Sequence, residues 1–305
     1  MARPKTPRFP LRSPRAWPAW IAVGVGWLIS RLPLSAVFAL GGAFGRLAHA
    51  ISSSRRHIAE TNLRLCFPEM SDAERAELVR ANFVHTTLGA IEVMLPWLNP
   101  KRDLSPNIDV IGAEHYEAAR DEGRGVLVLA CHFTTMDVIS QPLSRLGTFD
   151  VMYRYNKHPV WEWLQVSGRK RYFDGVVERQ DTRQVLKRLR AGRSIWYAAD
   201  QDYGAKVSVF APFFGVSAAS ITATARFAKL NDSPVVMMTT HRDLTRKRWA
   251  IEFHPALTDY PTGDDVADAT RINQLIEGFV RQAPEQYLWV HKRFKTRPEG
   301  EPSLY

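Results

Sequence analysis

The stretch Gly125-Val-Leu-Val-Leu-Ala-Cys-His132-Phe-Thr-Thr-Met-Asp137 places a histidine, and five positions later a carboxylate, directly after a continuous apolar run. Residues 126–130 are apolar on both faces and follow two glycines, a pattern typical of a buried strand in a parallel sheet. His132 therefore lies at the carboxyl end of the predicted strand. Open α/β sheets bind their ligands at that edge.

The spacing of His132 and Asp137 limits how the two side chains can meet. Positions i and i+5 are about 140° apart on a continuous helix, so we place His132 in the turn before a helix and Asp137 in its first turn. We expect Asp137 to accept the proton on one ring nitrogen, which leaves the other nitrogen free as a general base. The residues alone leave two alternatives open. His132 would be a hydrogen-bonded packing residue in one, and Cys131 would be a thiol nucleophile in the other.

The rest of the chain predicts alternating strands and helices. Further strands are expected at residues 150–154, 194–199, 234–240 and 249–254. Helices are expected at residues 58–65, 71–98, 113–122, 159–172, 182–191, 218–230 and 267–283, and the second of these opens with Ser71-Asp-Ala-Glu74, the spacing of a capping box. This alternation predicts an α/β fold with a mixed, largely parallel sheet and helices on both faces.

The amino-terminal segment is the part most suited to a membrane. Five basic residues, Arg3, Lys5, Arg8, Arg12 and Arg15, precede an uncharged run at residues 17–30, and a second apolar stretch follows at residues 34–51. The first run spans about 21 Å as a helix, less than the roughly 30 Å of hydrocarbon in a bilayer. We expect a re-entrant hairpin or interfacial helices with both ends cytoplasmic. A single-pass anchor is the alternative. We divide the chain into this tail and anchor, residues 1–56, and a catalytic domain, residues 57–305.

Composition narrows the classes of partner. The 305 residues carry 41 Lys and Arg against 31 Asp and Glu, a net charge of +10, which favours anionic lipids, phosphorylated glycolipids or acidic proteins. The chain shows no zinc-finger spacing, RNP motif or basic heptad helix, so we expect no nucleic acid. Two cysteines are too few for a disulfide framework and indicate a reducing, cytosolic setting. No metal-site spacing is evident, and we expect neither a metal nor a cofactor.

Five further blocks extend the His-x-x-x-x-Asp motif over nearly the whole chain. They are Tyr153-Arg-Tyr-Asn-Lys-His-Pro159, Gly168-Arg-Lys-Arg171, Asp200-Gln-Asp-Tyr-Gly204, Ala211-Pro-Phe-Phe-Gly-Val216 and Tyr287-Leu-Trp-Val-His-Lys-Arg-Phe-Lys-Thr-Arg-Pro298. In this order they resemble the late, or secondary, acyltransferases of lipid A biosynthesis, within the glycerolipid and lysophospholipid acyltransferase superfamily. The length and the basic, tryptophan-rich amino terminus are similar to the lauroyl-transferring members.

The resemblance implies an O-acyltransferase in lipopolysaccharide biosynthesis. It would transfer a fatty acyl group, lauroyl by this likeness, from acyl carrier protein to a hydroxyl on a hydroxyacyl chain of a Kdo-bearing lipid A precursor. The enzyme would work at the bacterial inner membrane, in contact with its lipids, with the catalytic domain on the cytoplasmic face. Other acceptors remain as alternatives: a lysophospholipid, glycerol phosphate or a phosphatidylinositol mannoside. So do a thioesterase and a non-catalytic membrane-binding relative.

Several polar and aromatic residues complete the predicted site. Asp200 ends the strand at 194–199 as His132 ends its own, so the two can converge on one sheet edge, and the resemblance implicates both Asp200 and Arg169 in activity. We expect backbone amides or a cationic side chain such as Arg169 to stabilise the oxyanion. We expect a basic cluster to bind the phosphates or acidic sugars of the headgroup: Arg154, Lys157, Lys170 and Arg171. The basic stretch at residues 291–297 could serve the headgroup, anionic lipid or the carrier protein. Three phenylalanines are candidates for an acyl pocket: Phe210, Phe213 and Phe214. Each group has an alternative. Asp200 and Arg169 would be members of structural ion pairs, the basic cluster would be a solvated surface, and the phenylalanines would be plain core.

Overall fold

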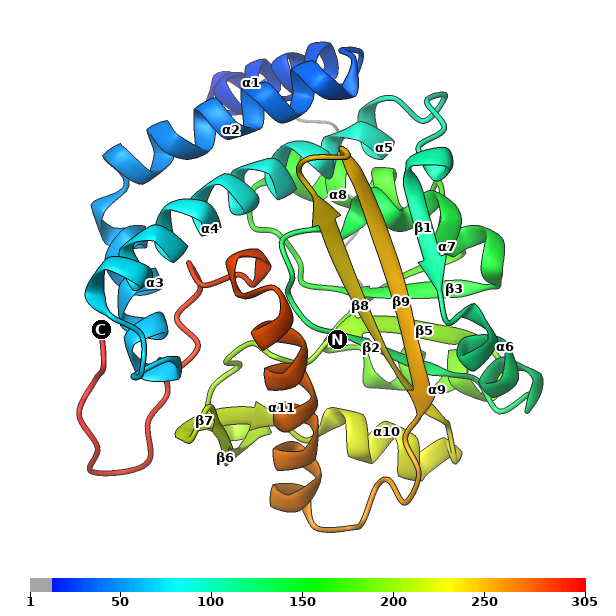
Figure 1. The fold of residues 1–305 in the computed structure, drawn as a ribbon. Helices are drawn as coiled ribbons and strands as arrows, with labels where there is room; N and C mark the ends of the chain where they lie inside the picture. Colours follow the sequence, from blue (N-terminus) through cyan, green and yellow to red (C-terminus); the bar gives the residue numbers. More distant parts are fainter. Residues whose placement is uncertain (1–12) are drawn as a thin grey trace.

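A seven-stranded sheet forms the centre of the computed structural model, which describes residues 13–305 (Figure 1). Arg3, Lys5, Arg8 and Arg12 of the predicted basic tail lie outside the described residues. The strands are β1 (Ile108–Ile111), β2 (Leu127–Ala130), β3 (Phe149–Tyr153), β4 (Gly175–Glu178), β5 (Ser194–Ala198), β8 (Val235–Asp243) and β9 (Arg248–Ala256). Their order is β1-β9-β8-β2-β5-β3-β4, and every neighbouring pair is parallel except β8 and β9. The predicted mixed, largely parallel sheet is confirmed.

Strand β2 is buried on both faces because it runs through the middle of the sheet. Leu127 and Leu129 point into one hydrophobic core, and Val126 and Val128 point into another on the opposite face. The continuous apolar run therefore follows from its central position, since neither face of the strand meets water. Strands β1 and β4, four residues each, were not predicted and lie at the two edges of the sheet.

Helices cover both faces of the sheet. Those after the amino-terminal pair are α3 (Ser53–Cys66), α4 (Asp72–Glu92), α5 (Met94–Leu98), α6 (Ala113–Asp121), α7 (Ser140–Leu146), α8 (Pro159–Arg169), α9 (Thr182–Arg190), α10 (Ala223–Asn231) and α11 (Asp265–Gln282). The capping box of α4 is present, with the Ser71 amide 2.7 Å from the Glu74 carboxylate and the Glu74 amide 3.3 Å from the Ser71 hydroxyl. The predicted helix at 71–98 is divided into α4 and α5. Pro96 cannot donate to the carbonyl of Glu92 and its ring crowds that turn, which accounts for the break.

The region at residues 208–221 forms a hairpin, so the prediction of a helix beginning at residue 218 was wrong. Strands β6 (Ser208–Phe213) and β7 (Val216–Ile221) pair antiparallel, and α10 begins only at Ala223. Phe214 and Gly215 have φ values of 50° and 74°, as a two-residue hairpin turn of the primed type requires. The residues of β7 are mostly small and do not alternate between apolar and polar as those of a half-buried strand do, so we predicted a helix there.

Two apolar helices lie across one end of the domain, α1 (Trp17–Ile29) and α2 (Leu34–Ile51) (Figure 1). Val23 of α1 packs with Trp97 and α8, and Phe38 of α2 belongs to one of the two cores that flank the sheet. Among residues 13–305, only α2 is long and apolar enough to cross a membrane. The division of the chain at residue 56 stays a prediction.

Candidate active site

His132 and Asp200 meet because their strands are neighbours in parallel register. Ala130 of β2 pairs with Ala198 of β5, so the residues two positions beyond each strand lie side by side at the carboxyl edge. The Nδ1 atom of His132 is 2.5 Å from Oδ1 of Asp200, and the His132 backbone N–H donates to Oδ2 at 2.9 Å. One carboxylate thus holds both the ring and the main chain of the histidine.

The Asp200 carboxylate is ionised although it is 1% exposed. Burial by itself raises its pKa, but the charge of His132, hydrogen bonds from the His132 ring and backbone, and the Tyr287 hydroxyl together lower the pKa to about 2. The ionised Asp200 carboxylate accepts the proton on Nδ1 of the His132 ring. The Nε2 atom is therefore the ring nitrogen left to act on a substrate.

Asp137 does not hold the His132 ring, contrary to our prediction. Its two carboxylate oxygens accept hydrogen bonds from Nε and Nη2 of Arg169, at 2.7 and 2.9 Å, and both residues are buried. Asp137 does begin the short helical turn that leads into α7, as the spacing indicated. The bidentate geometry gives each oxygen of Asp137 a partner in Arg169, whereas Asp200, distant in sequence, contacts the imidazole.

A large cavity opens beside the histidine. Its volume is about 920 Å³, and His132, Met136, Arg169, Trp196 and Phe227 are among the residues that line it. This volume lies at the upper end of the range for ligand pockets. The His132 side chain is 19% exposed, so its ring is accessible from the cavity while Asp200 is covered.

The lining of this cavity is strongly basic. Within residues 13–305 its lining holds no Asp or Glu. It holds five cations: Arg154, Lys157, Arg169, Arg179 and Arg226. Of the predicted basic cluster, Arg154 and Lys157 line the cavity, whereas Lys170 and Arg171 are exposed and do not. Arg179 and Arg226 were missed. Arg179 follows β4 as Arg154 follows β3, and recognising β4 as a parallel strand would have placed Arg179 at the same edge.

The three predicted acyl-pocket phenylalanines do not line this cavity. Phe213 is fully buried in the large core, and its ring packs against Phe214, Tyr287 and Phe294. Phe210 lies in the same hairpin strand, β6. The alternative of plain core describes Phe213 better, because apolar residues beside a tight turn are buried by the hairpin itself.

Other groups near His132 are unsuited to nucleophilic or metal chemistry. Cys131 is buried on the opposite side of the chain from its neighbour, and burial followed by the charge of Asp200 raises the pKa of its thiol well above the usual value. Across the part of the chain that the structure describes, no group of three His, Cys, Asp or Glu side chains could hold a metal ion. A second cavity, of about 10 Å³, is lined by His132, Asp200, Tyr287 and His291 among others.

An imidazole backed by a buried carboxylate at the strand ends of an open α/β sheet, with no activated thiol beside it, is an arrangement that can remove a proton from a hydroxyl or water. A family model described as "Bacterial lipid A biosynthesis acyltransferase" matches residues 6–296. The chain belongs to this family and is an acyltransferase.

Three curated relatives from Escherichia coli (strain K12) span almost the whole chain. A lipid A biosynthesis lauroyltransferase is 36% identical over 97% of both chains. A palmitoleoyltransferase is 34% identical over 96% of this chain and 95% of its own, and a myristoyltransferase is 31% identical over 96% and 92%. A solved structure of a 1-acyl-sn-glycerophosphate acyltransferase from Thermotoga maritima covers 81% of this chain and 94% of its own at 15% identity, with a TM-score of 0.36.

Proposed function

We propose that the chain transfers a fatty acyl group, lauroyl in the first instance, from acyl carrier protein to a hydroxyl of a hydroxyacyl chain on a Kdo-bearing lipid A precursor. The observation that carries this proposal is the His132–Asp200 pair at the wall of a cavity lined by five cations and no carboxylate among the described residues. The relative named a lauroyltransferase, which matches over 97% of its length, supports the choice of acyl group.

The chemical step follows from the tautomer that Asp200 imposes. Nε2 of His132 takes the proton of the acceptor hydroxyl as its oxygen bonds to the thioester carbonyl carbon. The carbon–sulfur bond then breaks, and the leaving thiolate recovers the proton from the imidazolium. Asp200 stabilises the imidazolium between these two transfers. Arg169, oriented by Asp137, supplies positive charge at the cavity wall for the oxyanion.

The basic lining suits an acceptor that carries phosphates and acidic sugars. Arg154, Arg179 and Arg226 have no carboxylate partner among the ion pairs of residues 13–305, so their charges are available to a ligand. Arg179 also stacks its guanidinium 4.4 Å from the centre of the Tyr203 ring, which fixes its plane. Charge-assisted hydrogen bonds from such arginines recognise phosphate oxygens in pairs.

We further propose that α1 and α2 lie in the surface of the inner membrane, with the catalytic domain in the cytoplasm. One face of each helix packs on the domain, while the other exposes apolar side chains at helical spacing: Trp17, Ile21, Val25 and Leu28 on α1, and Phe44, Leu47 and Ile51 on α2. Exposed Arg46 and Arg55 border this face and suit anionic headgroups. A helix whose one side is fixed to a globular domain is better suited to lie along a bilayer than to cross it.

A transfer assay tests the proposed reaction. Purified protein in detergent would receive a Kdo-bearing tetra-acylated precursor with lauroyl, myristoyl or palmitoleoyl carrier protein in competition, and mass spectrometry would follow the products. We expect a mass gain of one lauroyl group that disappears in His132→Ala. Folding of this variant would be checked by its melting temperature.

Each other outcome identifies a different error. Gain of a longer chain would keep the reaction and reject lauroyl specificity. Free fatty acid without ester would indicate a thioesterase. No product with the lipid A precursor, but ester formation on a lysophospholipid or glycerol phosphate, would reject the acceptor.

A further inference from the structure

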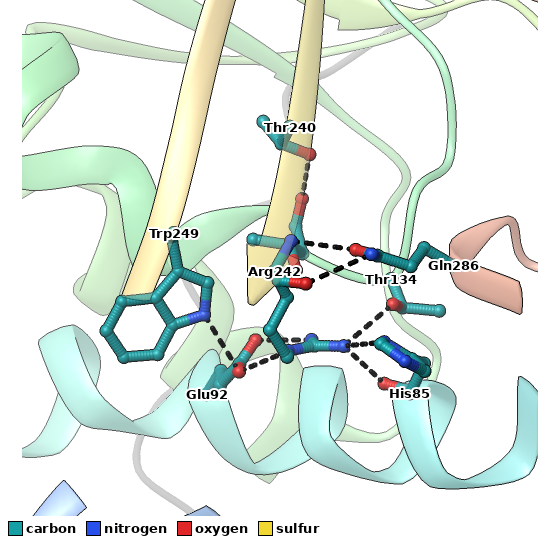
Figure 2. Close-up of polar contacts among 8 residues, drawn as sticks. His85, Glu92, Thr134, Thr240, Arg242, Trp249 and Gln286 are labelled. Atoms are coloured by element: carbon teal, nitrogen blue, oxygen red, sulfur yellow. Dashed lines mark hydrogen bonds and ion pairs between the residues drawn. The ribbon is translucent and has the colours of Figure 1, made fainter. Parts of the chain in front are cut away.

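A buried ion pair joins α4 to β8 beside the segment that follows His132 in the chain (Figure 2). Arg242 donates from Nε and Nη2 to the two oxygens of Glu92, at 2.6 and 2.5 Å, and the two side chains are 0% and 1% exposed. The indole of Trp249 donates to the same carboxylate at 2.9 Å. His85 accepts from Nη1 of Arg242 at 2.9 Å, and burial, followed by the charge of Arg242, lowers the His85 pKa to about 3, so its ring is neutral.

Such a pair is a weak source of stability, because the cost of desolvating two charges is close to the attraction between them. Its placement indicates a different role. None of the residues in this cluster lines the large cavity, so the cluster does not contact a ligand held there. It contacts the segment that follows His132 instead.

Three ties connect the cluster to that segment. Nη1 of Arg242 donates to the Thr134 hydroxyl at 3.2 Å, and the Thr240 hydroxyl donates to the carbonyl of Thr135 (Figure 2). The Gln286 side chain bonds both the N–H and the C=O of Arg242, at 2.8 and 3.0 Å, while the Gln286 carbonyl accepts from the Thr134 N–H at 2.8 Å. The loop after β2 is thus attached to β8 directly and through Gln286.

Helix α4 closes the other side of the loop. A Cβ atom at Gly89 would lie 2.1 Å from the carbonyl oxygen of Thr134, so only glycine allows this approach. The chain after Gln286 also reaches the base: the Leu288 N–H donates to the carbonyl of His132 at 3.0 Å, and the Tyr287 hydroxyl bonds Asp200. The main chain around His132 is therefore fixed by α4, β8 and the segment after α11.

We propose that Arg242 and Glu92, acting through Thr134, Thr240 and Gln286, are positioning residues that set the place of His132 at the cavity. The inference rests on the proposed role of His132 as base. Displacement of a catalytic group by about 1 Å can reduce a rate about 100-fold, which gives such a clamp a catalytic consequence without any contact to substrate.

Thr134→Val and Thr240→Val test the clamp, because each keeps the side-chain shape and removes one tie while the Arg242–Glu92 pair remains. We expect the double variant to lower kcat about 10- to 100-fold with KM for donor and acceptor within about twofold of wild type. The low-field proton resonance of the His132 Nδ1–H, identified by its absence in His132→Ala, should shift or broaden. Each single variant should show a smaller change in the same direction.

Asp150→Asn is the matched control. Asp150 forms a bidentate pair with Arg193, at 2.8 Å for both bonds, and is fully buried, but it lies near the start of β3, toward the sheet edge opposite His132. This variant should lower the melting temperature and leave kcat and the His132 resonance unchanged.

A double threonine variant with wild-type kcat and an unchanged resonance would overturn the proposal and leave the cluster a structural element. If the double variant does not fold, the same two readouts on Thr134→Val alone decide the question. Failure of the proposed function has a separate signature: full activity in His132→Ala would show that His132 is not the base, whatever the threonine variants do.

Discussion

Two carboxylates were candidates to serve His132, and the structure gives them different tasks. Asp137 lies five residues away in sequence and pairs with Arg169, whereas Asp200 lies sixty-eight residues away and holds the imidazole. The difference comes from the sheet: β2 and β5 are hydrogen-bonded neighbours, so the residues that follow them are closer in space than residues separated by one turn. Adjacency of strands, which single-sequence spacing does not reveal, decides the partner.

The largest expected effect separates the two carboxylates. Asp200→Asn should reduce kcat by about 10²–10⁴-fold, because an amide neither stabilises the imidazolium nor enforces the Nε2-active tautomer. Asp137→Asn should reduce kcat much less. Steady-state kinetics on both variants, with melting temperatures as controls, measures this. Equal losses in the two variants, or a greater loss for Asp137→Asn, would reverse the assignment.

Asp137→Asn should instead act on stability. Removing one partner of a buried pair leaves the Arg169 charge uncompensated and costs about 3–5 kcal/mol of the free energy of unfolding. The double variant Asp137→Asn, Arg169→Gln should be more stable than Asp137→Asn alone, since no buried charge then lacks a partner. Urea unfolding of the three proteins provides the measurement. Strictly additive losses would mean that the pair is not coupled.

The arginines that line the cavity should affect substrate binding, in contrast to Asp200, which should affect the chemical step. Arg179→Gln and Arg226→Gln should each raise KM for a phosphorylated acceptor about 10-fold and leave kcat near wild type. The reason is that these residues bind the headgroup of the ligand and take no part in the chemical step. Arg183→Gln on the exposed face of α9 is the control. An acceptor without phosphate should be insensitive to all three changes. A rise in KM for the carrier protein instead would assign these arginines to the donor.

The last prediction concerns the pH dependence of stability and His291, which lies on the side of the site that holds Asp200. Burial, followed by the positive charge of His132, lowers the pKa of His291 to about 4, with Arg293 acting in the same direction and Asp200 and Asp202 opposing it. The unfolded chain binds this proton near pH 6.5, so stability should fall as pH decreases from 6.5 to 4, by up to about 1.4 kcal/mol per pH unit. In His291→Gln that contribution to the slope should be absent. The measurement is the free energy of unfolding from urea titrations at several pH values. If its dependence on pH is the same in His291→Gln as in wild type, the pKa of His291 is not lowered by folding.

Much of the fold was accessible from the sequence because it depends on local pattern. The apolar run before His132 and the capping box at Ser71 each specify their own element, and both were predicted correctly. The convergence of His132 and Asp200 was also predicted, since both follow parallel strands. Edge strand β4 has only four residues, too few to show a pattern, and Arg179 was therefore missed as well.

What could not be predicted depends on distant contacts. The β6–β7 hairpin is set by pairing of two weakly patterned segments around Phe214 and Gly215, and the choice between Asp137 and Asp200 is set by strand order. The cluster around Arg242 gathers α4, β8, β9 and the segment after α11, so no window of sequence contains it.

The two cysteines are both buried, and burial raises the pKa of each thiol. With Cys66 and Cys131 the only cysteines in the chain, the folded protein presents no reactive thiol at its surface. Single cysteines introduced along α1 or α2 can therefore be labelled with maleimide dyes in an otherwise native background. Quenching of those dyes by brominated lipids would read out, residue by residue, how deep each helix sits.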